Sequence, residues 1–384
     1  MTEIYLDNSA TTKPYPEVID AMAFSMREEF YNPSALYRQA VETERKLAEA
    51  RAVIAAPLGM QADNVVLTSG GTESNNLAIL GHLKTLRGGG TVLYSGAEHA
   101  AVRNTCAEAE AMGFAVKRLP LDGRGSLDMR ALEGLLDSSV RLLCVMHVSN
   151  ETGAILPVEQ AVALRDRLAP QAAVHVDGVQ AYLRVPLSMK KLAIQSYAVS
   201  AHKVHGPKGV GALIVRDGHK IAPLMLGGGQ QRGLRAGTDN TVGAAGFAAA
   251  VSACKPEAYA ALRQIKAEMV KMLLAEIPDA VVIGPPPEDT DAAPHILCVS
   301  LPPVKAETMV HALAAEGVIV GTGSACSSRT RKYSAALTEM GIAPGLMDSA
   351  IRISFSAPNT LDEVKTAAQR IAAQYQLLKK FTRR

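Results

Sequence analysis

A glycine-containing segment after an apolar run could bind a phosphate group. Thr68-Ser69-Gly70-Gly71-Thr72 follows residues 65–67, which are Val-Val-Leu. Glycines let a backbone approach a ligand closely, and N–H groups at the start of a helix point at an anion. The Thr72 hydroxyl would add a donor. Alone this signal is weak, because Ser/Thr-Gly turns before helices are common, and it matches neither a P-loop nor G-x-G-x-x-G.

An acid and an amine occupy similar positions further along the chain. Asp177 follows residues 173–176, and Lys203 follows residues 198–200. An aspartate in this position often caps a helix, and a lysine often lies in a surface loop. A lysine at a strand end is also a candidate to condense with an aldehyde. His202 and His205 are not accompanied by a carboxylate–histidine pattern, so we expect no metal site.

The three segments predict more together than separately. Pyridoxal phosphate needs an anion site, an acid to hold the proton of its pyridine nitrogen and an amine to react with its aldehyde. The phosphate cup, Asp177 and Lys203 follow in that order, each after its own apolar run. The sequence therefore predicts a pyridoxal-phosphate site.

The elements that must position these residues alternate between two kinds. Apolar runs at 65–67, 92–94, 140–145, 173–176, 198–200 and 210–215 are typical of strands covered on both faces. Helix-compatible stretches such as 159–168 lie between several of them. This alternation predicts an α/β fold with a mainly parallel sheet, whose ligands bind at the carboxyl ends of the strands.

The sequence pattern changes after about residue 255. A long helix is expected from Pro256, a loop at 284–287, strands at 296–301, 318–320 and 351–354, and a helix at 306–316. We therefore expect a large cofactor-binding domain at 15–255 and a smaller α+β domain formed by 1–14 and 256–384. A chain of 384 residues exceeds the roughly 250–300 at which a single core stops growing.

Composition excludes several classes of protein. The net charge of +3 is too small to indicate nucleic-acid binding, and the basic end of the chain is typical of a solvated terminus. No apolar run reaches the ~18 residues of a membrane helix, and the acidic start does not resemble a signal peptide. We expect a cytoplasmic protein without a membrane partner. The five cysteines are odd in number and widely spaced, which argues against disulfides and zinc sites.

From about residue 4 to 356, the chain resembles the cysteine desulfurases, which are class V members of the fold-type I pyridoxal-phosphate enzymes. The matching blocks are Tyr5-Leu6-Asp7-Asn8-Ser9-Ala10-Thr11-Thr12, Asn32-Pro33-Ser34, Thr68-Ser69-Gly70-Gly71-Thr72-Glu73-Ser74-Asn75, Glu98-His99, Asn150-Glu151-Thr152-Gly153, His175-Val176-Asp177-x-x-Gln180, Ser200-Ala201-His202-Lys203, Arg235-Ala236-Gly237-Thr238, Gly323-Ser324-Ala325-Cys326-Ser327-Ser328 and Arg352. Gly178 stands where this family usually has alanine or another small residue, and Gln231 where it often has glutamate.

The resemblance implies a role for each matching residue. Lys203 would bind the cofactor covalently, and Asp177 would pair with its ring nitrogen. Gln180 and Asn150 would contact the ring-oxygen edge, and His99 would stack on the ring and take part in proton transfer. The phosphate would be held by Gly71, Thr72, Ser200 and His202. Thr238 would reach the phosphate of the partner subunit. The substrate would be bound by Arg352 and Asn150.

Cys326 is the expected sulfur acceptor. It lies in a stretch of small and polar residues before Arg329-Thr330-Arg331-Lys332, whose cations favour a thiolate. We expect Cys106, Cys144, Cys254 and Cys298 to be small buried hydrophobes. The apparent loop length resembles the long-loop group, whose cysteine delivers sulfur to acceptor proteins.

The resemblance thus implies a homodimer that removes sulfur from L-cysteine, giving L-alanine and a persulfide. The acceptor would be an iron–sulfur scaffold or a tRNA-thiolation protein. A selenocysteine lyase, an aminotransferase of the same class and a non-enzymatic binding scaffold remain alternatives. Cys326 argues against the aminotransferase, and Lys203 together with Asp177 argues against the scaffold.

Overall fold

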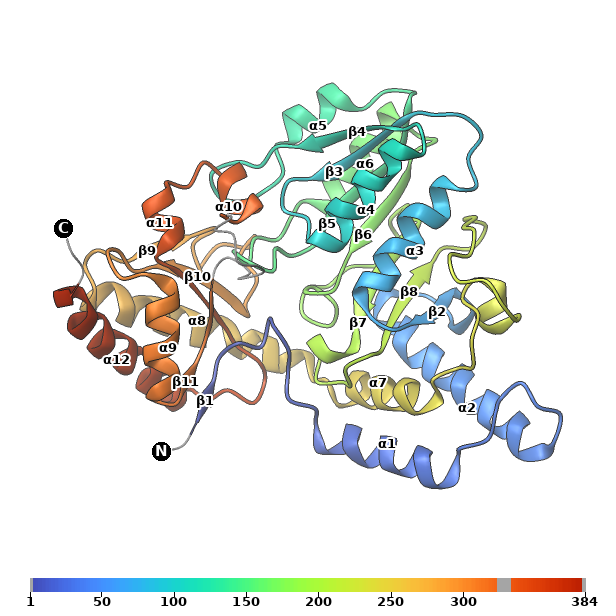
Figure 1. Cartoon of the computed structure of the whole chain (residues 1–384), viewed down its shortest axis with the longest axis horizontal. Coiled ribbons are helices and arrows are strands. Elements are labelled where there is room, and N and C mark those ends of the chain that lie inside the picture. Colours follow the sequence, from blue (N-terminus) through green and yellow to red (C-terminus); the bar gives the residue numbers. More distant parts are fainter. Residues whose placement is uncertain (1–2, 323–332, 382–384) are drawn as a thin grey trace.

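The computed structural model describes residues 3–322 and 333–381 (Figure 1). Its larger sheet has seven strands in the order β2-β8-β7-β6-β5-β3-β4. β8 is antiparallel to both of its neighbours, and the other pairs are parallel. The strands are β2 (Val65–Thr68), β3 (Thr91–Ser95), β4 (Ala115–Leu119), β5 (Val140–Met146), β6 (Ala173–Asp177), β7 (Ser196–Ser200) and β8 (Gly211–Val215).

Helices cover both faces of this sheet because its strands are apolar on both sides. One face packs against α3 and α4, through a core that includes Ile79, Val102 and Leu142. The opposite face packs against α2, α5, α6 and α7, with Leu47 and Phe247 in its core. The helices are α1 (Pro16–Glu28), α2 (Arg38–Ala55), α3 (Gly71–Leu83), α4 (Ala100–Ala111), α5 (Met129–Leu135), α6 (Val158–Leu168) and α7 (Thr241–Ala253), with short 3-10 turns at Ala56–Leu58, Ala62–Asn64, Ala201–Lys203 and Gln230–Gly233.

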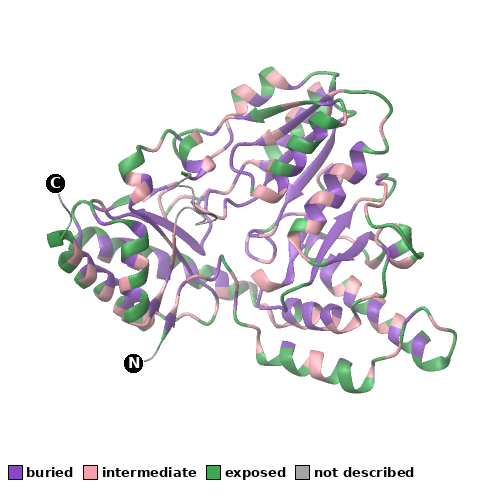
Figure 2. Cartoon of the chain, in the orientation of Figure 1, coloured by how far each residue is buried: buried purple, intermediate pink, exposed green. Residues whose placement is uncertain are grey.

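A second, smaller sheet is antiparallel, in the order β12-β13-β10-β9. Its core includes Leu297, Ile351 and Ile371 and is formed with three helices (Figure 2). A two-stranded sheet beside it pairs β1 near the N-terminus with β11. These elements are β1 (Ile4–Tyr5), α8 (Pro256–Glu276), β9 (Val281–Ile283), β10 (Ile296–Ser300), α9 (Ala306–Ala315), β11 (Val318–Ile319), β12 (Gly321–Thr322), α10 (Ala335–Glu339), α11 (Pro344–Asp348), β13 (Ala350–Ser354), α12 (Leu361–Leu378) and the 3-10 turn Lys379–Phe381.

The expected α/β fold with a mainly parallel sheet is confirmed, and all the apolar runs named above form strands. The short strands β1, β9 and β12 were not predicted, nor was β4, an edge strand whose central residues are mostly exposed. The antiparallel direction of β8 was not predicted either, because an apolar run can pair with its neighbours in a parallel or an antiparallel arrangement. Across the residues that the structure describes, no helix is long and apolar enough to cross a membrane.

Candidate active site

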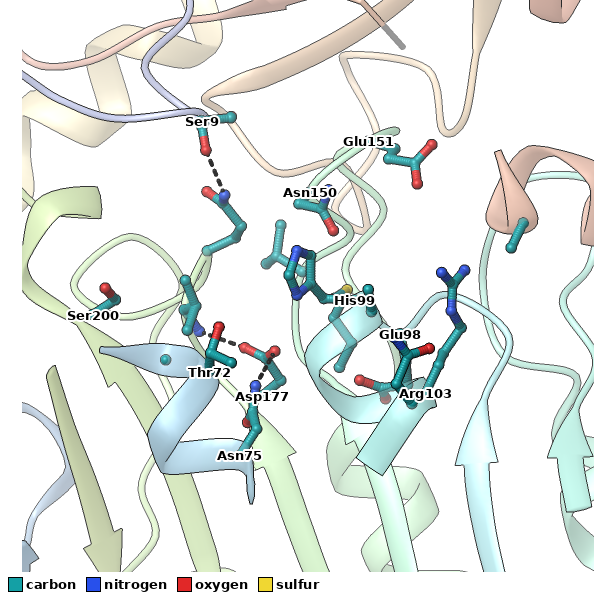
Figure 3. Close-up of a pocket in the computed structure, with 18 of the residues that line it drawn as sticks. Ser9, Thr72, Asn75, Glu98, His99, Arg103, Asn150, Glu151, Asp177 and Ser200 are labelled. Atoms are coloured by element: carbon teal, nitrogen blue, oxygen red, sulfur yellow. Dashed lines mark hydrogen bonds between the residues drawn. The ribbon is translucent and has the colours of Figure 1, made fainter. Parts of the chain in front are cut away.

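The three chemically distinct segments meet at one edge of the large sheet. β2 and β7 both pair with β8 in the antiparallel sense, so they run in the same direction, and β6 is parallel to β7. The carboxyl ends of β2, β6 and β7 therefore lie together. A cavity of about 840 Å³ opens there (Figure 3) and is lined by ten of the expected residues: Gly71, Thr72, His99, Asn150, Asp177, Gln180, Ser200, His202, Lys203 and Arg352.

The proposed phosphate cup is the beginning of α3. Gly70 precedes this helix and provides no side-chain cap, so the N–H groups of its first turn are left for another acceptor. A Cβ on Gly71 would lie 2.7 Å from Cγ2 of Val179, so no side chain fits at this position. The hydroxyls of Thr72 and Ser200 line the same part of the cavity. These groups are donors suited to an anion.

The acid of the site is Asp177, the buried last residue of β6. Burial raises the pKa of its carboxyl, whereas hydrogen bonds and nearby cations lower it. The Val179 N–H donates to Oδ1 at 3.0 Å, and Asn75 Nδ2 donates to Oδ2 at 2.8 Å. A cationic ring nitrogen placed in the cavity would stabilise this carboxylate further.

The amine of the site is Lys203, in the turn that follows β7. Its Nζ donates to the carbonyl oxygens of Ser9 at 2.5 Å and Ala10 at 2.8 Å. Burial, followed by the charges of Arg352 and Arg184, lowers its pKa to about 8. A lowered pKa gives the neutral, nucleophilic amine a larger population near neutral pH than an ordinary lysine has.

Four further polar residues line the cavity: His99, Asn150, Gln180 and His202. The pKa of His99 is lowered by desolvation, and its Nδ1 accepts the N–H of Ala101 at 3.1 Å. Gln180 Nε2 donates to the carbonyl of Ser9 at 3.0 Å. In Figure 3, His99 and Asn150 lie across the cavity from Ser200. Burial, followed by the charge of Lys203, lowers the pKa of His202 to about 4.

Arg352 brings a cation from the smaller sheet to the cavity. It lies on β13, and its side chain is only 13% exposed. Nη2 pairs with Oδ1 of Asp7 at 2.9 Å, and Nη1 donates to the carbonyl of Asn150 at 2.9 Å. Nε is buried and has no partner among the described residues. These contacts fix the guanidinium at the wall of the cavity.

One expected residue of the described chain, Thr238, does not line the cavity. Thr238 is exposed, in a segment that the Arg235–Glu73 ion pair, with Nε and Oε1 2.8 Å apart, holds against the first turn of α3. Glu73 also accepts the N–H of Ser69 at 2.7 Å, so this segment is tied to the phosphate cup. Cys326 and its block at 323–328 lie outside the described residues.

The cavity also contains charged residues to which the sequence analysis gave no role: Glu98, Arg103, Arg118 and Glu151. Glu98 is buried, and burial, with the nearby charge of Asp177, raises its pKa to about 8. Its Oε1 accepts the Ser95 hydroxyl at 2.8 Å, and its Oε2 has no partner in the described part of the chain. Glu98 could have been predicted from the sequence, because it belongs to the Glu98-His99 block that matches the family.

Both departures from the family pattern have a physical reason. A Cβ on Gly178 would lie 1.8 Å from Cε1 of Tyr197, so the tyrosine occupies the space that alanine would need. Gln231 is buried, accepts the Leu67 N–H at 2.8 Å and donates to Oδ1 of Asp239 at 2.6 Å. A glutamate at 231 would place two carboxylates in contact, whereas the amide can both accept and donate.

Comparison with known proteins gives consistent matches over nearly the whole chain. The family model "Aminotransferase class-V" matches residues 4–366. A cysteine desulfurase of Cereibacter sphaeroides is 38% identical over 366 residues, covering 95% of this chain and 93% of the relative.

Two solved structures share the fold. One, titled a NifS-like protein, has a TM-score of 0.90 and 33% identity, covering 98% of this chain and 100% of the other. The structure of SspA in complex with cysteine has a TM-score of 0.81 and 29% identity, covering 94% and 100%. The chain therefore belongs to the class V aminotransferase family and, within it, to the cysteine desulfurases.

Proposed function

We propose that the protein is a pyridoxal-phosphate-dependent cysteine desulfurase that forms L-alanine from L-cysteine and leaves the sulfur as a persulfide on Cys326. The observation that carries this proposal is the cavity in which Lys203, Asp177 and the start of α3 meet Arg352. Relatives named cysteine desulfurase and the cysteine complex of SspA support it. Neither a plain phosphate site nor a plain amino-acid site needs all four of these groups.

The chemistry of the donor set fits pyridoxal phosphate. The first turn of α3, with Thr72, Ser200 and His202, would hold the phosphate, and Asp177 the ring nitrogen. His99 would stack on the ring, Gln180 and Asn150 would contact its oxygen edge, and Lys203 would bind it covalently. When bound, the cofactor stores the electron pair that remains when the substrate loses its α-proton.

The protein's own residues would perform the remaining work. Arg352 orients the substrate carboxylate, a task suited to a planar guanidinium, with Asn150 beside it. Lys203 Nζ accepts the α-proton, which its lowered pKa allows near neutral pH. The sulfur of Cys326 then bonds to the substrate sulfur as the bond from that sulfur to the β-carbon breaks. A proton added to the β-carbon, which balances the proton lost by the substrate thiol, and the return of the α-proton from Lys203 complete alanine.

We propose that the protein acts as a homodimer in which Thr238 reaches the partner's phosphate site. Large apolar side chains are exposed on α1 and the segment after it, including Phe30 at 67% and Leu36 at 97%. Apolar patches of this kind mark interaction surfaces. A second copy covering this patch would form the homodimer.

A core formed only by residues of 1–14 and 256–384 supports the division into a small domain of these residues and a large domain at 15–255. The core of the large sheet extends into the small domain at Ile283, Cys298 and Met347, where the two parts pack together. We further propose that the persulfide sulfur passes in the cytoplasm to an acceptor protein, either an iron–sulfur scaffold or a tRNA-thiolation protein. The long-loop assignment of the Cys326 segment stays a prediction.

The direct test is to incubate the purified protein with L-cysteine and to measure alanine and sulfide, with and without a reductant. We expect equal amounts of alanine and transferable sulfur, with sulfide released on reduction. Transfer of the amino group to a keto acid without sulfide would indicate an aminotransferase instead. Turnover of selenocysteine alone would indicate a selenium-specific lyase.

A further inference from the structure

Arg184 is a buried cation to which neither the fold nor the proposed chemistry has yet given a role. It lies four residues after Gln180 and is 6% exposed. Among the ion pairs of the described residues, none involves Arg184. Burying a guanidinium without a carboxylate partner is unfavourable, so its contacts are informative.

The hydrogen bonds of Arg184 all reach residues of the candidate site. Nη2 donates to the carbonyl oxygen of Lys203 in a close contact. Nη1 lies 3.4 Å from both the carbonyl oxygen and Oε1 of Gln180. Nε is buried without a partner in the described chain. One side chain therefore contacts both the lysine and the glutamine that line the cavity.

These contacts close a ring of hydrogen bonds. Lys203 Nζ and Gln180 Nε2 both donate to the carbonyl oxygen of Ser9, at 2.5 and 3.0 Å. Arg184 joins the same two residues from the other side, through the Lys203 backbone and the Gln180 side chain. Each member limits the rotation of the next, so the turn at Ala201–Lys203 is held relative to Gln180.

The charge of Arg184 acts on the same lysine. After burial, Arg352 and Arg184 are the groups that lower the pKa of Lys203, while Asp7 and Asp177 raise it. His99 and His202 also face this amine, and each has its own pKa lowered mainly by burial. Because the histidines are neutral and the carboxylates oppose the two arginines, removal of either arginine should change the protonation of Lys203.

We propose that Arg184 is a positioning residue that fixes Lys203 and Gln180 in their reactive arrangement and keeps the lysine amine available in its neutral form. This proposal rests on the proposed function in one respect, which is that Lys203 reacts with pyridoxal phosphate. Its geometric part, the ring through Ser9, holds for the protein without any ligand.

The test measures the amine itself in the cofactor-free full-length protein. An acylating reagent is applied over a range of pH, and modification of Lys203 is followed by peptide mass spectrometry. In Arg184→Gln we expect Lys203 labelling at neutral pH to fall about threefold, which corresponds to a rise of about half a pKa unit. Arg184→Lys keeps the charge and should label within about twofold of the wild type.

Arg165→Gln is the matched control. Arg165 is equally buried and donates to the carbonyl oxygens of Ala172 and Ala193, but it does not line or contact the cavity. Its loss should lower stability without changing Lys203 labelling. If Arg184→Gln does not fold, Arg184→Lys tests the proposal instead. A lysine keeps the charge but cannot bond to both Lys203 and Gln180, so we expect this variant to bind pyridoxal phosphate measurably more slowly than the wild type.

Unchanged Lys203 labelling in Arg184→Gln, or unchanged cofactor binding in Arg184→Lys, would overturn the role of Arg184. A wild-type protein that binds no pyridoxal phosphate but shows the expected labelling shift would overturn the proposed function and leave this role intact. The two failures are therefore distinguishable.

Discussion

Asn75 connects the acid of the site to a buried histidine. Its Nδ2 donates to Asp177 at 2.8 Å, so its Oδ1 must be the acceptor in the 2.8 Å contact with His175 Nε2. Burial lowers the pKa of His175 to about 3, so the ring is neutral and carries its proton on Nε2. His175 Nδ1 then accepts the Ser196 hydroxyl at 2.9 Å. The orientation of the amide thus determines the tautomer of the histidine.

Replacing Asn75 by leucine should disturb this network from both ends. The carboxyl of Asp177 loses a hydrogen bond that lowers its pKa, and the N–H of His175 loses its acceptor. We expect a loss of about 1–3 kcal/mol in the free energy of unfolding, together with weaker cofactor binding. Chemical denaturation and cofactor titration check these effects. Asn76→Ala is the control, because partly exposed Asn76 donates to the carbonyl oxygen of Thr72 in its own helix and, among the described residues, does not contact Asp177 or His175.

Lys203→Ala should abolish covalent attachment of pyridoxal phosphate and lower turnover by about 10²–10⁴-fold, because the site loses both its amine and its proton acceptor. Borohydride reduction followed by peptide mapping locates the attachment in the wild type. Lys208→Ala, at an exposed position in the same segment, should behave like the wild type. A reduced label on Lys208 would show that the wrong lysine has been assigned.

Cys326→Ser should still bind cofactor and cysteine but release alanine at least about a hundredfold more slowly. A hydroxyl provides almost no anion near neutral pH, whereas a thiol has an ordinary pKa of about 8.5. Alanine assays and mass spectrometry of the persulfide measure the effect. Cys254→Ser is the control, since Cys254 contacts Tyr259 away from the cavity. Normal sulfur release from Cys326→Ser would favour a lyase that needs no protein persulfide.

Glu98→Gln should change how stability depends on pH. Because burial raises the pKa of Glu98 to about 8, the folded state binds more protons than the unfolded state between about pH 4.5 and 8. Wild-type stability should therefore fall across this range, relative to the variant, by on the order of 4 kcal/mol. Denaturation at pH 5 and pH 8 measures the difference. Parallel pH profiles for the two proteins would mean that Glu98 is already ionised at pH 5.

Leu36→Glu should weaken the proposed homodimer, because it places a charge in the exposed apolar patch beside α1. Sedimentation at decreasing concentration should show monomers, and cofactor affinity should fall if Thr238 serves the partner site. Leu377→Glu, on α12 and 48% exposed, is the control at an apolar position outside this patch. A wild-type protein that is fully active as a monomer would contradict both parts of the proposal.

The sequence predicted the large sheet because its central strands are continuous apolar runs. β5 and β6, which are almost entirely buried, were found with nearly correct ends. β4 was not found, because Lys117 and Arg118 occupy exposed positions of an edge strand and interrupt its apolar pattern. The order of the strands and the direction of β8 depend on pairing across the sheet, which local periodicity does not contain.

The sequence predicted those site residues that act through a charged side chain at the end of a strand. Asp177 and Lys203 are of this kind. Arg184 donates to the backbone carbonyl oxygen of Lys203, and the carbonyl oxygen of Ser9 accepts from Lys203. Every residue has a carbonyl oxygen, so the residue type at these positions does not reveal such contacts. The contact between Asp7 and Arg352 joins residues 345 positions apart, so no local pattern could reveal it.

The pairing of β1 with β11 has a consequence for folding during synthesis. Residues 4–5 find their partners only at 318–319, and Ser9 and Ala10 hold the amine of Lys203 once they are in place. During synthesis on the ribosome, the large sheet can form while the N-terminal segment is still without its strand partner. We therefore expect the amine of Lys203 to reach its final environment only after residues 318–319 have emerged, so that a nascent chain ending before them would have its large sheet but an incomplete site.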